Sequence, residues 1–305
     1  MELTSSVIWP VVDPMGPTMA GMSKSRRKSK HNYADSSRGK RLQKVLAEAG
    51  VASRRACEQL IEEGLVAVNG EIVSSLPAWA DPAEDKITVE DRPITRTRQH
   101  VYVMLFKPRG TVSTNSDPEG RTRAIDLVNH PQRPRLFPVG RLDADSSGLL
   151  LLTNDGEFAN RLTHPRFGVH KGYEVTVSGR LEESEITRLE KGIFLTGRSR
   201  GTASRTSRSR LSIIKRDRDR TLLYMELREG RNRQIRRMMA QMGFPVKKLR
   251  RVRMGSLSLK GLAPGEWREL SAGELSSLRR AAYRVRERIQ GDKSSKKGNA
   301  SLKKH

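Results

Sequence analysis

Apolar residues between positions 41 and 73 first follow a helical spacing and then alternate with polar residues. In RLQKVLAEAGVASRRACEQLIEEGLVAVNGEIV, two apolar stretches with helical spacing are followed by Gly50 and Gly64. This pattern predicts two short helices that end at the glycines, with Ser53 as the N-cap of the second. VAVNGEIV alternates around an Asn-Gly pair, which is a strong hairpin signal. We therefore predict a compact module of two helices and a β-hairpin.

The chain after this module is rich in strand-like patterns. VYVMLFK and LLLLT are apolar runs typical of buried strands, and YEVTVSG, LSIIKRD and TLLYMELREG are further strand-like runs. Helical spacing is present over residues 182–191 and 232–242. Strands outnumber helices, and several follow one another closely enough to form hairpins. The pattern therefore predicts an α+β fold with a mixed, largely antiparallel sheet.

Both ends of the chain lack periodicity and contain runs of basic residues and serine. The N-terminal segment contains SKSRRKSK, and the C-terminal segment reads RERIQGDKSSKKGNASLKKH. We therefore expect both segments to be disordered arms. The predicted organisation is a basic arm over residues 1–37, the helix-and-hairpin module over 38–98, the strand-rich domain over 99–285 and a basic tail over 286–305.

The charge of the chain predicts an anionic partner. The 305 residues include 59 Lys and Arg against 34 Asp and Glu, a formal net charge of +25. Such an excess favours nucleic acid bound through its phosphates. The longest apolar run, residues 149–152, is too short to cross a membrane, so we expect no membrane partner. The first residues do not form a convincing signal peptide, and we expect a cytoplasmic protein.

The sequence favours chemistry without a metal or a cofactor. Cys57 is the one cysteine, which excludes an intramolecular disulfide and a multi-thiolate metal site, and its helical surroundings predict a buried side chain. The six histidines show no spacing typical of metal ligands. The sequence also lacks P-loop and dinucleotide-binding fingerprints. We expect neither a metal nor a cofactor.

GRLDADSSGLLLLT places charged residues directly before an apolar strand. In an extended segment Arg141 and Asp143 share a face, while Leu142 packs behind them. DADSSG is typical of a turn, and the leucines then enter the core, so the carboxylate lies on a loop fixed by a buried strand. A nucleophile or a general base fits this position. An ordinary surface Arg–Asp pair is the alternative interpretation.

Separate stretches of the chain resemble known families. Residues 41–94 resemble the S4 RNA-binding domain. VGRLDADSSGLLLLTNDGEFANRLTHP, KGYEVTV and EGRNRQIRRMMAQMGFPVKKLRRVRMGSLSL resemble, in order, the motifs of pseudouridine synthases of the ribosomal RsuA/RluB type. The resemblance covers roughly residues 41–270. It implies a monomeric enzyme without a cofactor that isomerises one uridine of ribosomal RNA, most like the large-subunit (RluB-like, 23S-type) form.

The same resemblance implies roles for individual residues. Asp143 corresponds to the catalytic carboxylate, and Tyr173 to the tyrosine that stacks on the target uracil. Arg236 corresponds to the arginine that pairs with the catalytic carboxylate. Ile235 corresponds to an apolar residue of the pocket, and Lys171 to a basic residue close to the tyrosine.

Further basic residues are candidates for contacts with RNA. At helical spacing Arg233, Arg236 and Arg237 share a face, whereas Arg231 is expected to meet backbone phosphate. Arg54 and Arg55 lead the second helix, where backbone N–H groups also favour phosphate. The complete set of expected RNA contacts is Arg54, Arg55, Lys171, Arg231, Arg233 and Arg237. Arg141 and Arg236 would keep the catalytic carboxylate ionised, whether it attacks the sugar or deprotonates it.

Several alternatives stay open at this point. Asp145 rivals Asp143, although its place inside the turn predicts greater exposure. Tyr173 could be an ordinary core tyrosine, and the basic helix an ordinary solvated face. For the whole chain the rival is a non-catalytic S4-type RNA-binding ribosome-assembly factor. A pure binder has no need of a carboxylate among arginines, so the intact set of Arg141, Asp143, Tyr173 and Arg236 favours the enzyme.

Overall fold

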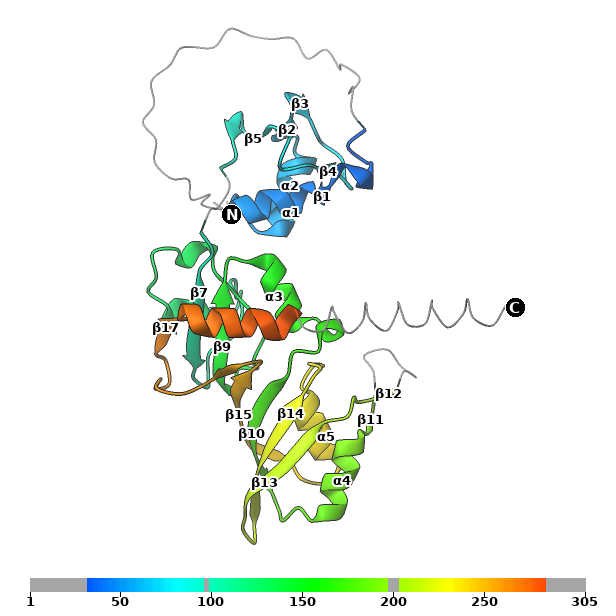
Figure 1. Ribbon diagram of the computed structural model, residues 1–305, viewed down its shortest axis with the longest axis vertical. Helices are drawn as coiled ribbons and strands as arrows, with labels where there is room; N and C mark the ends of the chain where they lie inside the picture. Colours follow the sequence, from blue (N-terminus) through cyan, green and yellow to red (C-terminus); the bar gives the residue numbers. More distant parts are fainter. Residues whose placement is uncertain (1–31, 96–98, 197–202, 284–305) are drawn as a thin grey trace, which may run out of the picture. The chain divides into compact units, whose positions relative to one another are not determined.

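The computed structural model describes residues 32–95, 99–196 and 203–283 (Figure 1). The chain divides into two compact units, the first ending at Gln99 and the second beginning at His100. Most of the two expected arms lies outside the described residues. The expected limit of the first arm at residue 37 is too late, because Tyr33 is buried in the first unit and its hydroxyl donates to the carbonyl of Val68 at 2.9 Å.

The first unit contains the predicted helices and hairpin. Its elements are the 3-10 helix η1 (Ser36–Arg38), β1 (Lys40–Arg41), α1 (Leu42–Ala49), α2 (Arg54–Glu62), β2 (Val66–Val68), β3 (Glu71–Ile72), β4 (Trp79–Ala80), β5 (Ile87–Val89) and β6 (Arg92–Pro93). Gly50 ends α1 with a φ of 82°, and the Ser53 hydroxyl accepts a hydrogen bond from the N–H of Ala56 at the start of α2. Asn69 and Gly70 both have positive φ, as a tight hairpin turn requires.

The core of the first unit joins α1 and α2 to the small sheet β3-β2-β5-β6. Leu42 and Leu46 of α1 are fully buried, and so are Cys57 and Ile61 of α2. Cys57 is therefore the buried side chain that its surroundings predicted. Arg54 and Arg55, the first two residues of α2, are exposed.

The second unit is built on a mixed, largely antiparallel sheet, as predicted. Its strands are β7 (Tyr102–Lys107), β8 (Phe137–Pro138), β9 (Ser147–Thr153), β10 (Lys171–Ser178), β11 (Phe194–Thr196), β12 (Ala203–Arg205), β13 (Arg210–Arg216), β14 (Arg220–Leu227), β15 (Val246–Met254), β16 (Leu257–Ser258) and β17 (Trp267–Glu269). Its helices are η2 (Ala124–Leu127), η3 (Arg133–Arg135), α3 (Gly156–Thr163), η4 (Pro165–Phe167), α4 (Glu183–Lys191), α5 (Gln234–Gln241) and a helix over 272–283. In the described chain the main sheet has the order β13-β14-β10-β15-β9-β7-β17, and β15 pairs with β9 in parallel.

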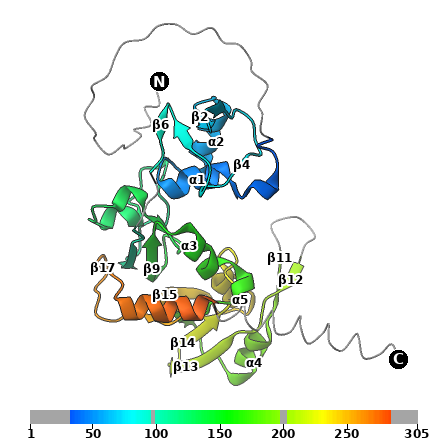
Figure 2. The ribbon, with the colours of Figure 1, turned by 45° about the horizontal axis from the view of Figure 1, so that its top comes forward.

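Helices cover both faces of the sheet at β9 (Figure 2). Leu150 and Leu152 pack on one face in a cluster that includes residues of α4 and α5. Leu149 and Leu151 pack on the other face with residues of α3 and of the helix over 272–283. Because both faces are covered, the strand is an unbroken apolar run rather than an alternating one. Among the described residues, no helix is long and apolar enough to cross a bilayer.

The parallel contact between β9 and β15 requires a glycine. Gly148 has a φ of +111°, and a Cβ at this position would lie 2.7 Å from the backbone N of Arg251 and closer still to its carbonyl oxygen. Both the conformation and the space therefore exclude a side chain.

We predict that Gly148→Ala lowers the free energy of unfolding by about 1–3 kcal/mol or more, because the backbone of β15 has to move. Gly273→Ala is the matched control, since a Cβ there meets nothing within 4 Å. Chemical denaturation of both variants is the measurement. Equal stability of Gly148→Ala and the parent would contradict the close packing of the two strands.

Candidate active site

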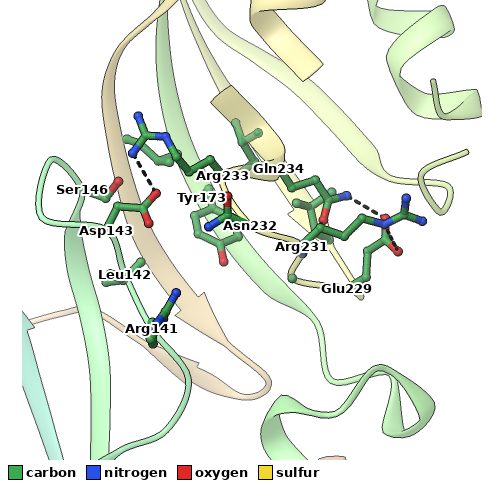
Figure 3. A pocket seen from close by; sticks show the side chains of 14 residues that line it. Arg141, Leu142, Asp143, Ser146, Tyr173, Glu229, Arg231, Asn232, Arg233 and Gln234 are labelled. Carbon is green, nitrogen blue, oxygen red and sulfur yellow. Dashed lines mark hydrogen bonds and ion pairs between the residues drawn. The ribbon is translucent and has the colours of Figure 1, made fainter. Parts of the chain in front are cut away.

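A cavity of about 340 Å³ lies between two loops of the second unit (Figure 3). One is the Asp143 loop, residues 140–146, which precedes β9, and the other is the Arg233 loop, residues 228–233, which precedes α5. Tyr173 of β10 and Leu249 of β15 line the cavity between them. The sheet thus brings together residues that lie far apart in the sequence.

The Asp143 loop has the geometry that the sequence predicted. Leu142 is buried, while Arg141 and Asp143 on either side of it both line the cavity. The N–H of Ser146 donates to the carbonyl of Asp143 at 3.0 Å, which closes the expected turn. Within the described part of the chain, however, Arg141 makes no ion pair with Asp143. Its exposed side chain lines the cavity instead, so the expectation that it keeps Asp143 ionised by pairing is wrong.

The carboxylate of Asp143 pairs with Arg233. Arg233 Nη1 lies 3.3 Å from Asp143 Oδ2, and Arg233 Nη2 lies 3.0 Å from Asp145 Oδ2. Arg236 reaches Asp145 at 3.0 Å and donates to the Asp145 carbonyl at 3.1 Å. The expected pair of Arg236 with Asp143 is therefore wrong. Arg236 lies inside α5 and meets the next carboxylate of the loop, while Arg233 precedes the helix and spans both carboxylates.

Arg233 has an unusual backbone conformation. It is the N-cap residue of α5, with φ 45° and ψ 35° in the left-handed region. A non-glycine residue held there costs about 1–3 kcal/mol, and such strain is typical of functional sites. The expectation that Arg233, Arg236 and Arg237 share one helical face fails for this reason, because Arg233 lies outside the helix.

The two carboxylates of the loop differ in their surroundings. Asp143 lines the cavity and its side chain is 32% exposed, whereas Asp145 is 37% exposed and faces Arg233 and Arg236. Burial opposes ionisation of Asp145, but the hydrogen bond from Arg233 and the charge of Arg236 outweigh it and lower the pKa of this carboxyl. Asp145 thus pairs with two arginines, whereas Asp143 pairs with Arg233 alone and lines the cavity.

Apolar side chains line the same cavity as Asp143. Tyr173 is 9% exposed and Ile235 is 4% exposed, and both line the cavity together with Leu227 and Leu249. Figure 3 shows Tyr173 between the Asp143 loop and Asn232. The structure therefore places Tyr173 and Ile235 at the predicted site. A flat aromatic ring beside a carboxylate suits a planar, uncharged base.

Three of the expected RNA contacts are instead engaged within the protein. Lys171 is 7% exposed and its Nζ donates to the carbonyl of Val169 at 3.2 Å. Arg231 binds Glu229 at 3.2 Å and also donates to Ser204 and Arg205 of β12. Arg237 donates to the carbonyl of Thr196. These side chains bind other parts of the protein near the cavity. Their spacing in the sequence could not distinguish this role from phosphate binding.

Other contacts hold the Arg233 loop in place. Gln234, which is buried, donates to Glu229 Oε1 at 2.7 Å and accepts from the N–H of Arg231 at 3.0 Å (Figure 3). Sequence reasoning missed Glu229 and Gln234, although both lie in the quoted EGRNRQIRR motif. Within the described ranges, no cluster of three or more His, Cys, Asp or Glu is arranged to hold a metal ion.

Three cations are buried in the second unit. Lys107, Lys171 and Arg251 are each less than 10% exposed. Burial lowers the pKa of Lys107 to about 8; Arg251 adds to this effect, and the nearby carboxylates act against it. Burial and Arg251 likewise lower the pKa of Lys171 to about 8. Each lysine is therefore less basic in the folded protein than in the unfolded chain.

Comparison with known proteins finds relatives of both units of the chain. The sequence pattern of the RNA pseudouridylate synthase family matches residues 101–241, and that of the S4 domain matches residues 40–76. A protein of Bacillus subtilis named ribosomal large subunit pseudouridine synthase B is 44% identical over 243 residues, covering 79% of this chain and 96% of its own. A Haemophilus influenzae protein of the same name is 37% identical over 79% of this chain and 67% of its own. A pseudouridylate synthase crystal structure shares 32% identity and a TM-score of 0.57 over 78% of this chain and 99% of its own.

We predict that Lys171→Met stabilises the protein at pH 7 by up to about 3 kcal/mol, and that the gain disappears towards pH 10.5. A folded-state pKa of about 8, below the ordinary lysine value of 10.5, means that the unfolded chain binds more protons between these pH values. The parent therefore gains stability as pH rises through this window, and the variant lacks the contribution of Lys171 to that rise.

Chemical denaturation across pH 7–10 is the measurement, with Lys248→Met at an exposed position of β15 as the control. The prediction is contradicted if Lys171→Met is less stable than the parent at pH 7 and its free energy of unfolding depends on pH as that of the parent does. Burial of the Lys171 charge would then not destabilise the protein.

Proposed function

The chain belongs to the RNA pseudouridylate synthase family, and we propose that it converts a specific uridine of large-subunit ribosomal RNA to pseudouridine with Asp143 as the catalytic carboxylate. The observation that carries this assignment is the position of Asp143, at a cavity that Tyr173 and Ile235 also line. The relatives from Bacillus and Haemophilus, both named for the large ribosomal subunit, support the choice of RNA.

The proposed reaction is an isomerisation whose atoms balance without a co-reactant. The bond from uracil N1 to the ribose C1′ breaks and a bond from C5 to C1′ forms. The hydrogen on C5 leaves as a proton, and N1 takes up one proton. An ionised carboxylate at C1′ or at the adjacent C2′–H begins the reaction by attack or by deprotonation. Arg233 pairs with Asp143 at 3.3 Å and so holds its carboxylate in position at the cavity.

The target base has to leave its stack to reach Asp143. Unstacking a base costs a few kcal/mol, and stacking on an aromatic ring returns about 1–3 kcal/mol. Tyr173 supplies that ring, and Ile235 and Leu249 complete the apolar surface around it. Because these side chains are already packed in the sheet, the pocket needs little rearrangement to receive the base.

Exposed basic residues are the contacts that we propose for the RNA backbone. Arg141 lies beside Asp143 at the cavity, and Arg54 and Arg55 lie at the start of α2 in the S4 unit. Arg233 pairs with the carboxylates of the Asp143 loop, and its side chain is exposed enough to contact a phosphate as well. We propose a monomer acting in the cytoplasm, with residues 38–98 as the RNA-binding domain and 99–285 as the catalytic domain.

We predict that Asp143→Asn reduces isomerisation to background and leaves RNA affinity equal or slightly higher, because a negative charge near phosphate is gone. Asp145→Asn should keep part of the activity, with a fall of about 10- to 100-fold, because it loosens Arg233 but leaves Asp143 in place. Release of tritium from uracil C5 of ribosomal RNA measures the reaction. Thermal melts and RNA titrations on the same preparations control for folding and binding.

An active Asp143→Asn protein together with a dead Asp145→Asn protein would move the catalytic role to the second carboxylate. If both variants were fully active, the protein would be the non-catalytic RNA-binding assembly factor.

We also predict that the double variant Arg54→Ala, Arg55→Ala weakens RNA binding and lowers the slope of log affinity against log salt by about 1–2, because each phosphate contact releases counterions. The turnover number at saturating RNA should stay unchanged. Filter binding over a range of salt concentrations is the measurement. The exposed pair Lys86 and Arg92, replaced together by alanine, controls for the loss of two charges. Equal slopes of log affinity against log salt for the two double variants would show that α2 does not contact RNA.

A further inference from the structure

Every backbone carbonyl from Leu142 to Ser146 accepts a hydrogen bond within the described residues. The donors are Ser113 Oγ to Leu142 at 2.9 Å, Ser146 N to Asp143 at 3.0 Å, Gly110 N to Ala144 at 2.7 Å, Arg236 Nη2 to Asp145 at 3.1 Å and Lys107 Nζ to Ser146 at 2.8 Å. The Asp143 loop is thus held along its whole backbone, and three of the five donors come from one segment, residues 107–113.

These three donors continue the sheet beyond its last paired residues. β7 and β9 pair antiparallel up to Lys107 and Gly148. Past that point the donors at positions 107, 110 and 113 meet the carbonyls of residues 146, 144 and 142, so the two segments still run antiparallel. Two of the donors are side chains, which replace the backbone N–H groups of a regular ladder. Residues 107–113 therefore form a support for the Asp143 loop.

Ser113 is the member of this support that lies next to the catalytic position. Its side chain is 8% exposed, and its hydroxyl both donates to the Leu142 carbonyl at 2.9 Å and accepts from the Leu142 N–H at 3.2 Å. In the described chain, the Ser113 hydroxyl thus bonds both the N–H and the carbonyl of Leu142. Leu142 is itself buried and lies between Arg141 and Asp143.

We propose that Ser113 is a positioning residue for Asp143, which fixes the backbone on the N-terminal side of the carboxylate through both polar groups of Leu142. This inference rests on the proposed role of Asp143. Without the hydroxyl, a buried N–H and a buried C=O lose their partner, and the backbone shifts to satisfy them. A displacement of about 1 Å at a reacting group can lower a rate about 100-fold.

The expected effect falls on turnover rather than on RNA binding. Ser113 is buried and lies outside the cavity lining, so its loss removes no contact with RNA. A merely structural role predicts something different, namely a loss of stability with no specific loss of turnover. Ser209 provides the matched control, because it is also 8% exposed and its hydroxyl donates to the Leu189 carbonyl at 3.2 Å, away from the cavity lining.

The experiment compares Ser113→Ala, Ser113→Thr and Ser209→Ala in the full chain. The substrate is ribosomal RNA from a strain that lacks this gene, labelled with tritium at uracil C5. We expect Ser113→Ala to lower kcat about 10- to 100-fold with KM changed less than about threefold. Ser113→Thr, which keeps the hydroxyl, should recover most of the turnover. Ser209→Ala should melt at a lower temperature than the parent and keep its kcat.

Equal kcat losses in Ser113→Ala and Ser209→Ala, or an unchanged kcat in Ser113→Ala, would overturn the proposal. If Ser113→Ala fails to fold, Ser113→Cys carries the test, because its weak hydrogen bonding should give an intermediate kcat in a folded protein. A folded Ser113→Cys protein with parental kcat would likewise overturn the proposal. Failure of the proposed function is distinguishable, since the parent itself would then release no tritium.

Discussion

The guanidinium of Arg233, held between Asp143 and Asp145, is the contact on which the arrangement of the site depends. It joins a loop before β9 to a loop before α5, 90 residues later in the sequence. The side chain of Arg233 is 44% exposed, so the ion pairs contribute little to the free energy of folding. Their role is geometric. Arg233 makes them from a left-handed backbone conformation, and the hydrogen bonds of Gln234 and Arg231 to Glu229 hold the loop in which that conformation occurs.

The buried sheet makes this arrangement rigid. Leucines 149–152 are fully buried on both faces of β9, so the strand that follows the Asp143 loop cannot shift without opening the core. Gly148 brings β15 against β9, and Arg251 from β15 donates to the Leu149 carbonyl at 2.7 Å. The same packing buries Lys107 and Lys171 at a cost to stability. A site that needs one carboxylate held at one position thus rests on a strand fixed from both sides.

Local patterns were enough to predict most elements of the fold. The helices α1 and α2, the hairpin at Asn69-Gly70 and the strand of four leucines follow from periodicity, capping and turn preferences within a few residues. The predicted end of the first arm, residue 37, was wrong, because the one buried tyrosine at position 33 produces no periodic signal in the sequence.

The site could be predicted only in part. The motif located Asp143, Tyr173 and Ile235 at the cavity, but not the partner of the carboxylate. The family resemblance assigned this pairing to Arg236. The sequence carries no signal that Arg233 adopts a left-handed conformation, which glycine or asparagine usually takes. Lys171 was expected at the RNA surface but is buried. Its burial could not be predicted, because it depends on strands that are distant in the sequence. Ser113, 30 positions before Asp143, carries no pattern that links it to the loop.

The most direct test of the account is a map of pseudouridines in ribosomal RNA from cells with and without this gene. We expect one position in the large-subunit RNA to lose its pseudouridine on deletion and to regain it when the parent chain is supplied, with the other positions unchanged. The same pseudouridine map before and after deletion would contradict the assignment of this chain as the enzyme for a ribosomal uridine.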